Sequence, residues 1–110
     1  MKRIYTFGHE QVERNITVGD IIENKQKDIK MTQVTAANQE EAEIIAAQNI
    51  DMIITGSDWY EDVRKGAPHT FITAALFAGR FITNEEILRG AFEVMMAGAD
   101  SVLTPRSFEV

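Results

Sequence analysis

The stretch that decides the fold is Ile50–Asp58, which reads I-D-M-I-I-T-G-S-D. A short apolar run that ends at a turn is typical of a strand buried on both faces of a sheet. Gly56 allows a tight turn or a close backbone approach, and Ser57 and Asp58 stand where a helix can begin. In parallel α/β proteins, ligands bind just past the carboxyl ends of such strands. The stretch therefore predicts a central strand with a candidate site at its end.

The composition is that of an ordinary globular domain. Of the 110 residues, 45% are hydrophobic and 25% are charged, and the formal net charge is −6. Nucleic-acid binders usually carry a basic stripe, and none is visible, so we expect no nucleic-acid partner. The lack of cysteine excludes disulfides and thiolate metal sites. Because no apolar run is long enough to span a bilayer, we expect a cytoplasmic protein without membrane contact.

Strand and helix patterns alternate after a first segment, residues 1–15, which we interpret as an N-terminal arm. Within it, residues 3–7 are either a short strand or part of the arm, and we expect residues 8–15 to be irregular. Helix starts are marked by N-capping residues, with capping boxes at the first and third: Thr17, Asn38 and Thr83. The expected strands are 31–36, 50–55, 70–76 and 101–104, and the expected helices begin at 17, 39, 57 and 84. After Thr83, one helical face is apolar, and we expect it to be core: Ile87, Leu88, Ala91, Phe92 and Met95.

Two internal matches support this alternation. Thr32–Ala37 resembles Thr70–Ala75, and Asp51–Thr55 resembles Asp100–Thr104. Repeated βα units joined by helices require a parallel sheet with right-handed crossovers. Four such units are half of a (β/α)8 barrel of the TIM type, and we expect residues 16–110 to form the first four. A Rossmann-like sheet is the competing architecture, but no G-x-G-x-x-G motif follows any expected strand.

The length sets a further expectation. A complete barrel needs at least about 200 residues. The chain is therefore expected to be either a fragment or a half-barrel that forms a homo-oligomer to cover its open sheet edges.

Several stretches resemble a known family. They are Arg64–Pro68 (R-K-G-A-P), Ala97–Asp100 (A-G-A-D), the lead-in 16–30 and the strand end Thr35–Ala36. Together they resemble ketopantoate hydroxymethyltransferase (3-methyl-2-oxobutanoate hydroxymethyltransferase), of the phosphoenolpyruvate mutase and isocitrate lyase superfamily of barrels. The resemblance begins near residue 16 and covers the first half of that barrel.

The resemblance implies an activity. The family transfers a hydroxymethyl group from methylenetetrahydrofolate to a 2-oxo acid in pantothenate biosynthesis. It uses a divalent ion, usually Mg²⁺, that chelates the oxo acid and polarises its carbonyl. The implied partner is a small 2-oxo acid, and the implied general base lies in the half of the barrel that this chain lacks.

The chain departs from the family at the strand ends. Where the family has glycine, aspartate and serine, this chain has Gly56, Ser57 and Asp58. Ala75 stands in place of a metal-binding aspartate. Leu103 and Pro105 stand in place of a lysine and a glutamate, and Asn38 replaces an aspartate.

The candidate site residues are Asp58 for the metal and Thr35, Ser57 and Arg106 for the substrate. Asp58 is either a metal ligand or an acidic residue that the helix dipole stabilises. Ser57 either contacts a phosphate or carboxylate or caps the helix. Arg106 either clamps a carboxylate or is solvated, and Arg80 is a second basic candidate.

Three threonines, Thr35, Thr55 and Thr104, end strands in the same way. They form either a ring of hydroxyls at one end of the sheet or simply good strand positions. His69 precedes its strand, so we expect it at the opposite end of the sheet, in a structural role.

Two hypotheses of different classes remain. The first is an enzyme of the hydroxymethyltransferase type acting on a 2-oxo acid. The second is a non-catalytic barrel relative that binds a small carboxylate or phosphate, or that serves as an assembly module. The second is motivated by the losses at Ala75, Leu103 and Pro105.

Overall fold

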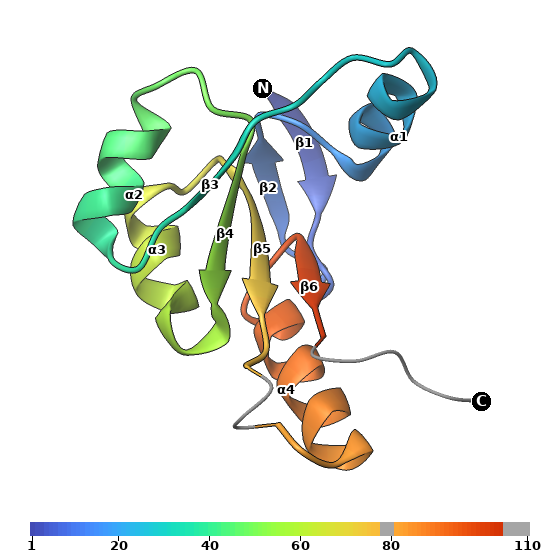
Figure 1. The fold of residues 1–110 in the computed structure, drawn as a ribbon, viewed down its shortest axis with the longest axis vertical. Helices are drawn as coiled ribbons and strands as arrows, with labels where there is room; N and C mark the ends of the chain where they lie inside the picture. Colours follow the sequence, from blue (N-terminus) through green and yellow to red (C-terminus); the bar gives the residue numbers. More distant parts are fainter. Residues whose placement is uncertain (78–80, 105–110) are drawn as a thin grey trace.

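The computed structural model, which describes residues 1–77 and 81–104, is a mixed α/β structure with a four-stranded parallel sheet and a separate hairpin (Figure 1). No helix in these residues is long and apolar enough to cross a membrane. The elements are β1 (Lys2–Tyr5), β2 (Gln11–Arg14), α1 (Val18–Gln26), β3 (Gln33–Thr35), α2 (Gln39–Ala46), β4 (Met52–Gly56), the 3-10 helix η1 (Ser57–Trp59), α3 (Tyr60–Gly66), β5 (Phe71–Ala75), α4 (Asn84–Met96) and β6 (Ser101–Leu103).

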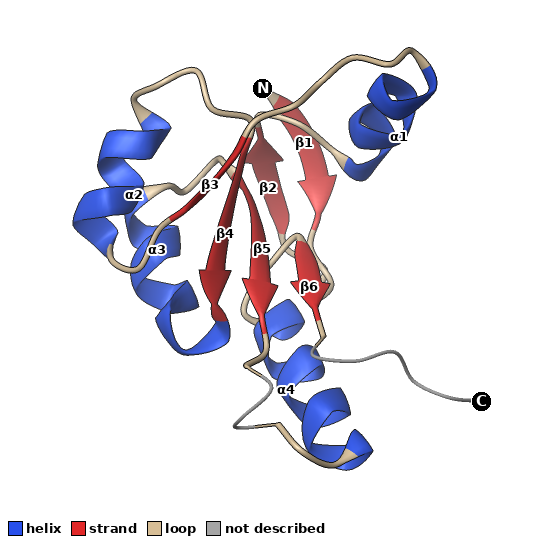
Figure 2. Cartoon of the chain, viewed as in Figure 1, coloured by secondary structure: helices blue, strands red, loops and turns tan. Residues whose placement is uncertain are grey.

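The sheet follows the order of the chain, β3-β4-β5-β6, and every neighbouring pair is parallel. Figure 2 shows these strands side by side, with α2 and α3 beside β3 and β4. The expected alternation of strands and helices is confirmed. Each strand is a little shorter than predicted, and α2 ends at Ala46, two residues before the end at Gln48 that the pattern from Gln39 predicts.

The helices cover one face of the sheet. Val34, Ile53 and Ile72 lie in register across three strands, as do Thr55, Ala74 and Val102 one step further along. The core cluster joins this face to all three connecting helices, through Ala42 of α2, Val63 of α3 and Val94 of α4 among others. A sequential parallel sheet with helices on one side buries only that side.

The opposite face, which we call the open face, is not fully buried. The prediction that the central strand is buried on both faces is therefore wrong for Met52 and Ile54, which are half-buried. In contrast, Ile53 and Thr55 on the covered face are at most 2% exposed. The open face consists of Gln33, Thr35, Met52, Ile54, Gly56, Phe71, Thr73, Ala75, Ser101 and Leu103, of which Gly56 and Phe71 are buried and the others are half-buried or exposed.

The N-terminal segment is a β-hairpin, so the prediction that residues 8–15 are irregular is wrong. β1 and β2 pair antiparallel, with Ile4 opposite Val12. The turn is closed by hydrogen bonds between Thr6 and Glu10, and His9 takes a left-handed conformation with φ 65°. The polar composition of β2 does not indicate a strand, because its only inward-facing residues are Val12 and the charged Arg14.

A buried ionic cluster ties this hairpin to the sheet at the end where the strands begin. Arg14 Nε donates to both carboxylate oxygens of Asp100, at 2.8 and 3.0 Å. Arg64 donates to Asp100 Oδ2 at 2.8 Å, and the backbone N–H of Ile72 donates to the same oxygen at 2.9 Å. Arg14 and Asp100 are 3% and 4% exposed. The side chain of Arg64 is 16% exposed. Charges buried to this extent are tolerated because each of the three is paired and hydrogen-bonded.

Asp51 and Asp100, which occupy the same position in one of the two sequence repeats, make the same kind of backbone contact. Asp51 accepts from the backbone N–H of Thr32 at 2.9 Å, just as Asp100 accepts from that of Ile72. In each case a carboxylate at the start of a strand holds the preceding strand. His69 also lies at this end, with its ring nitrogen 3.1 Å from the Glu13 carbonyl oxygen, as expected for a structural role.

Helix starts are as predicted. Thr17 and Thr83 form capping boxes with Asp20 and Glu86, and the side chain of Asn38 accepts from the N–H of Glu41. Each cap satisfies helix N–H groups that have no partner within the helix. Helix starts are therefore predicted reliably from the capping residues of this sequence.

The predicted core face of α4 is partly wrong. Leu88 and Phe92 are 58% and 57% exposed, whereas Gly90 and Val94 are buried together with Ile87. Gly90 takes the inner position because the ring of Phe81 packs where a Cβ would otherwise lie. The apolar period is helical as predicted, but the helix is rotated so that this glycine faces inward.

We predict that Asp100→Ala destabilises the protein by about 3–5 kcal/mol, because it leaves two guanidinium groups in a buried site without their anion. Glu23→Ala, which breaks the exposed Glu23–Lys27 pair, is the control and should cost about 0.5 kcal/mol or less. Urea unfolding followed by circular dichroism measures both. Equal losses for the two variants would contradict a structural role of the cluster.

Candidate functional site

The carboxyl end of β4 leads directly into η1. Ser57 and Asp58 are the first two residues of this 3-10 helix, and α3 follows at Tyr60. Gly56 has φ −70°, so the turn needs no left-handed residue. The predicted change from strand to helix at this point is confirmed.

The lack of a side chain at Gly56 instead leaves room for the close approach of an aromatic ring. A Cβ at this position would lie 2.4 Å from the Phe77 ring. Phe77 also packs edge-on against Trp59, with ring centroids 5.6 Å apart. Both aromatic side chains are less than half exposed, so they cover the end of β4 on the side of Gly56.

Two hydroxyls at the end of β4 have no hydrogen-bond partner among the described residues. They are the buried oxygens of Thr55 and Ser57. Thr55 lies on the covered face of β4, and Ser57, one residue past the strand, lines the cleft beside α4. An unpaired buried hydroxyl is costly, and a bound water or ligand would satisfy it.

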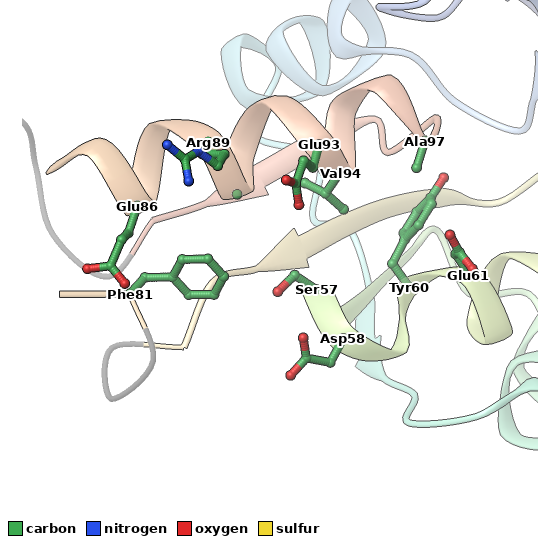
Figure 3. Close-up of a pocket in the computed structure, with 11 residues that line it drawn as sticks. Ser57, Asp58, Tyr60, Glu61, Phe81, Glu86, Arg89, Glu93, Val94 and Ala97 are labelled. Atoms are coloured by element: carbon green, nitrogen blue, oxygen red, sulfur yellow. The ribbon is translucent and has the colours of Figure 1, made fainter. Parts of the chain in front are cut away.

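Ser57 borders a cleft of about 310 Å³ between α3 and α4 (Figure 3). Figure 3 shows α4 forming one wall, with Arg89 and Glu93 on it, and Ser57 and Asp58 on the opposite wall. The lining residues are Ser57, Asp58, Tyr60, Glu61, Phe81, Glu86, Arg89, Gly90, Glu93, Val94 and Ala97.

The charges of the cleft are mostly negative. Four carboxylates and one guanidinium, that of Arg89, line it. The Glu86 carboxylate forms part of the capping box of α4. Hydrogen bonds from the Thr83 backbone N–H and hydroxyl hold the pKa of this carboxyl below its ordinary value. Arg89 adds a smaller effect in the same direction. Arg89 is therefore the group in the cleft best suited to receive an anion.

Tyr60 connects the cleft to the ionic cluster. Its hydroxyl accepts a hydrogen bond from Arg64 Nε at 2.9 Å. Burial raises the pKa of the Tyr60 hydroxyl, although the neighbouring Arg64 opposes this shift. The phenol therefore stays neutral and serves as a fixed wall of the cleft.

The predicted site residues are only partly brought together. Ser57 and Asp58 border the same cleft, but Thr35 is exposed on the open face and does not line it. Of the two alternatives for the strand-end threonines, the ring of hydroxyls does not form, because Thr35 pairs with Ile54 on one face while Thr55 pairs with Ala74 on the other. Arg106 and Arg80 lie outside the described residues.

The residues at the end of β4 do not by themselves fit a magnesium site. Mg²⁺ prefers octahedral oxygen coordination with at least one or two carboxylates. Asp58 and the Ser57 hydroxyl offer two donors, and in residues 1–77 and 81–104 no group of three His, Cys, Asp or Glu side chains could hold a metal. We therefore derive no chemistry from a metal at Asp58.

Sequence reasoning missed Arg89 and Phe81. Arg89 follows Glu86 by three residues on the helix that the Thr83 capping box starts, so its place beside the strand ends could have been inferred from that helix. No sequence pattern predicted that Phe81 lines the cleft, because its packing on Gly90 depends on tertiary contact.

No protein-family model, curated protein or solved structure matches this chain.

Gly56→Ala should destabilise the protein by about 1–3 kcal/mol, because the added methyl group displaces the Phe77 ring. Removing that ring in the double variant Gly56→Ala/Phe77→Ala should recover part of the loss. Gly19→Ala is the control, since a methyl group there meets only the Thr17 hydroxyl at 3.6 Å and should stabilise α1. Thermal unfolding of these three variants and of the single variant Phe77→Ala tests this, and additive losses in the double variant would refute the proposed clash.

The lowered pKa of Glu86 predicts a pH dependence. The stability that its charge contributes is present above the ordinary pKa of 4.5 and is lost as the pH falls through the lowered folded value. Glu86→Gln can keep the cap but does not titrate, so its deficit relative to the parent should shrink between pH 7 and about pH 3. Urea unfolding at several pH values measures this, with Glu85→Gln as the control. A constant deficit would argue against the charged cap.

Proposed function

We propose that this chain is a ketopantoate hydroxymethyltransferase-like protein that binds a small 2-oxo acid beside the carboxyl end of β4. The proposal includes a (β/α) barrel-type architecture, of which the four parallel strands form half. Hydroxymethyl transfer from methylenetetrahydrofolate is the reaction that the family resemblance implies.

One observation carries the family relation. The two most specific stretches of the resemblance, Arg64–Pro68 and Ala97–Asp100, meet through the ion pair between Arg64 and Asp100. Both stretches precede strands and lie where β5 and β6 begin. A shared pattern that forms one contact supports a shared scaffold better than two unrelated matches would.

The ligand class follows from the groups at the cleft. A carboxylate can accept from the guanidinium of Arg89 and from the unpaired Ser57 hydroxyl. The other charges on the walls are carboxylates, which repel an anion. We therefore expect weak binding that depends on Arg89 and that strengthens when a neighbouring carboxylate such as Glu93 is neutralised.

A second candidate function is a non-catalytic relative that binds the same carboxylate. It is favoured by Ala75 and Leu103 at the strand ends and by the incomplete donor set at Asp58. The aromatic pair Trp59 and Phe77 over Gly56 also covers a strand end that an enzyme of this fold would keep accessible.

Exchange of the 3-proton of 3-methyl-2-oxobutanoate in D₂O, followed by NMR with and without Mg²⁺, separates the two functions. The enzyme should accelerate exchange, and Ser57→Ala should reduce it at least about tenfold, the effect of losing one positioned hydrogen bond worth about 1.4 kcal/mol. Ser101→Ala, which removes a hydroxyl from the open face, is the control. Binding without exchange would support the non-catalytic relative.

Titration calorimetry on the same variants tests the binding site itself. Arg89→Met should weaken binding of the oxo acid, and Glu93→Gln should strengthen it. If neither the parent nor Glu93→Gln binds or exchanges the oxo acid, both functions are refuted.

A further inference from the structure

The cleft between α3 and α4 is elongated along α4. The residues of α4 that line it recur every three or four positions and so form one stripe of the helix: Glu86, Arg89, Gly90, Glu93, Val94 and Ala97. At a rise of about 1.5 Å per residue, Ala97 lies about 12 Å beyond Arg89 along the helix axis. A ligand whose carboxylate lies at Arg89 therefore has room for a chain that extends toward Ala97.

The floor of this part of the cleft is uncharged. Tyr60 and Val94, which line it, are 2% and 6% exposed. The Tyr60 hydroxyl is held by the hydrogen bond from Arg64, so its ring is fixed in place. An aliphatic chain that packs on these side chains leaves water, which favours binding.

Two carboxylates border the same part of the cleft. Glu61 lies on the α3 wall beside Tyr60, and Glu93 lies on the α4 wall (Figure 3). Within residues 1–77 and 81–104, neither carboxylate forms an ion pair. In contrast, the Glu86 carboxylate is used in the capping box of α4. Glu61 and Glu93 are therefore able to receive a positively charged group from opposite sides.

A simple 2-oxo acid fits these charges poorly. Its carboxylate meets the guanidinium of Arg89, but Glu61 and Glu93 repel it. The hydroxyl oxygen of Ser57, which is buried and has no partner among the described residues, adds a second polar contact for the carboxylate. A ligand with a carboxylate at one end and a cation at the other has an opposite charge for each of the three ionised side chains.

We infer that the ligand of this cleft is a zwitterion, a 2-oxo acid whose chain ends in a positively charged amine or guanidinium. Its carboxylate lies between Arg89 and Ser57, and its cation lies between Glu61 and Glu93. The chain between them packs on the uncharged floor. This inference rests on the proposed function, because it names the class of oxo acid that the same cleft selects.

Titration calorimetry with three oxo acids of similar length tests the charge preference. 5-Guanidino-2-oxopentanoate ends in a cation, 2-oxohexanoate in a methyl group and 2-oxoadipate in a carboxylate. The protein should bind the guanidino acid at least about threefold more tightly than 2-oxohexanoate, as expected for a cation beside two exposed carboxylates, and 2-oxoadipate least tightly. The preference should shrink in about 1 M NaCl, because salt screens exposed charges.

Glu93→Gln should change the affinities for two of these ligands in opposite directions. It should weaken binding of the guanidino acid and strengthen binding of 2-oxohexanoate, and the double variant Glu61→Gln/Glu93→Gln should show no preference between them. Glu85→Gln is the matched control, because it removes the same charge from α4 at a position that does not line the cleft. Arg89→Met should weaken binding of both acids and keep their order.

The outcomes separate this inference from the proposed function. If 2-oxohexanoate binds as tightly as the guanidino acid, or if the preference persists in the double variant, the inference is overturned and the proposed function stands. Butylguanidine, which has no carboxylate, should bind more weakly than the guanidino acid. Equal binding would overturn the inference, because the acidic walls would then attract any cation. If no oxo acid binds to the parent or to Glu93→Gln, the proposed function fails and the inference fails with it.

Discussion

The carboxylate of Asp100 is the constraint on which the rest of the structure depends. It accepts from Arg14 of the hairpin, from Arg64 of α3 and from the backbone of Ile72 in β5. The two guanidinium groups also donate to backbone oxygens of Pro68, Thr70 and Gly98, which fixes the connections around them. Because isolated buried charges are so costly, none of these segments can move alone without leaving a charge unpaired.

The two ends of the sheet therefore differ in how fully their polar side chains are hydrogen-bonded. Where the strands begin, Arg14, Arg64 and Asp100 are saturated with partners and have no capacity left for a ligand. Where β4 ends, the hydroxyls of Thr55 and Ser57 have no partner among the described residues, and a cleft lies beside the second of them. This division places stability at one end and potential binding at the other, as in barrel enzymes generally.

Local signals in the sequence were sufficient for the framework. Thr17, Asn38 and Thr83 marked helix starts, and the apolar run at Ile50 marked the central strand, because caps and strand runs depend on nearby residues. Short-range patterns do not determine how a helix is rotated about its axis. For α4 the rotation depends on Phe81 filling the space beside Gly90, a contact that no local pattern encodes.

The site was less predictable for the same reason. Ser57 and Asp58 were found from their place after a strand, but whether a strand-end residue meets its neighbours depends on which face it occupies. Thr35 and Thr55 look equivalent in sequence and lie on opposite faces, since their positions differ by one in the register. Arg89 comes from a helix more than 30 positions along the chain, so only the packing of α4 against α3 brings it to the cleft.

The separation of Arg14 from Asp100 along the chain also sets the timing of folding during synthesis. The two residues are 86 positions apart. At a translation rate of about 5–20 residues per second, roughly 4–17 s pass between the synthesis of Arg14 and the synthesis of Asp100, whose carboxylate neutralises it. During that interval the Arg14 guanidinium has no anion to pair with, so its burial is unfavourable and it stays hydrated. The N-terminal hairpin therefore docks only after β6 has begun to emerge, and a ribosome that stalls earlier leaves it undocked.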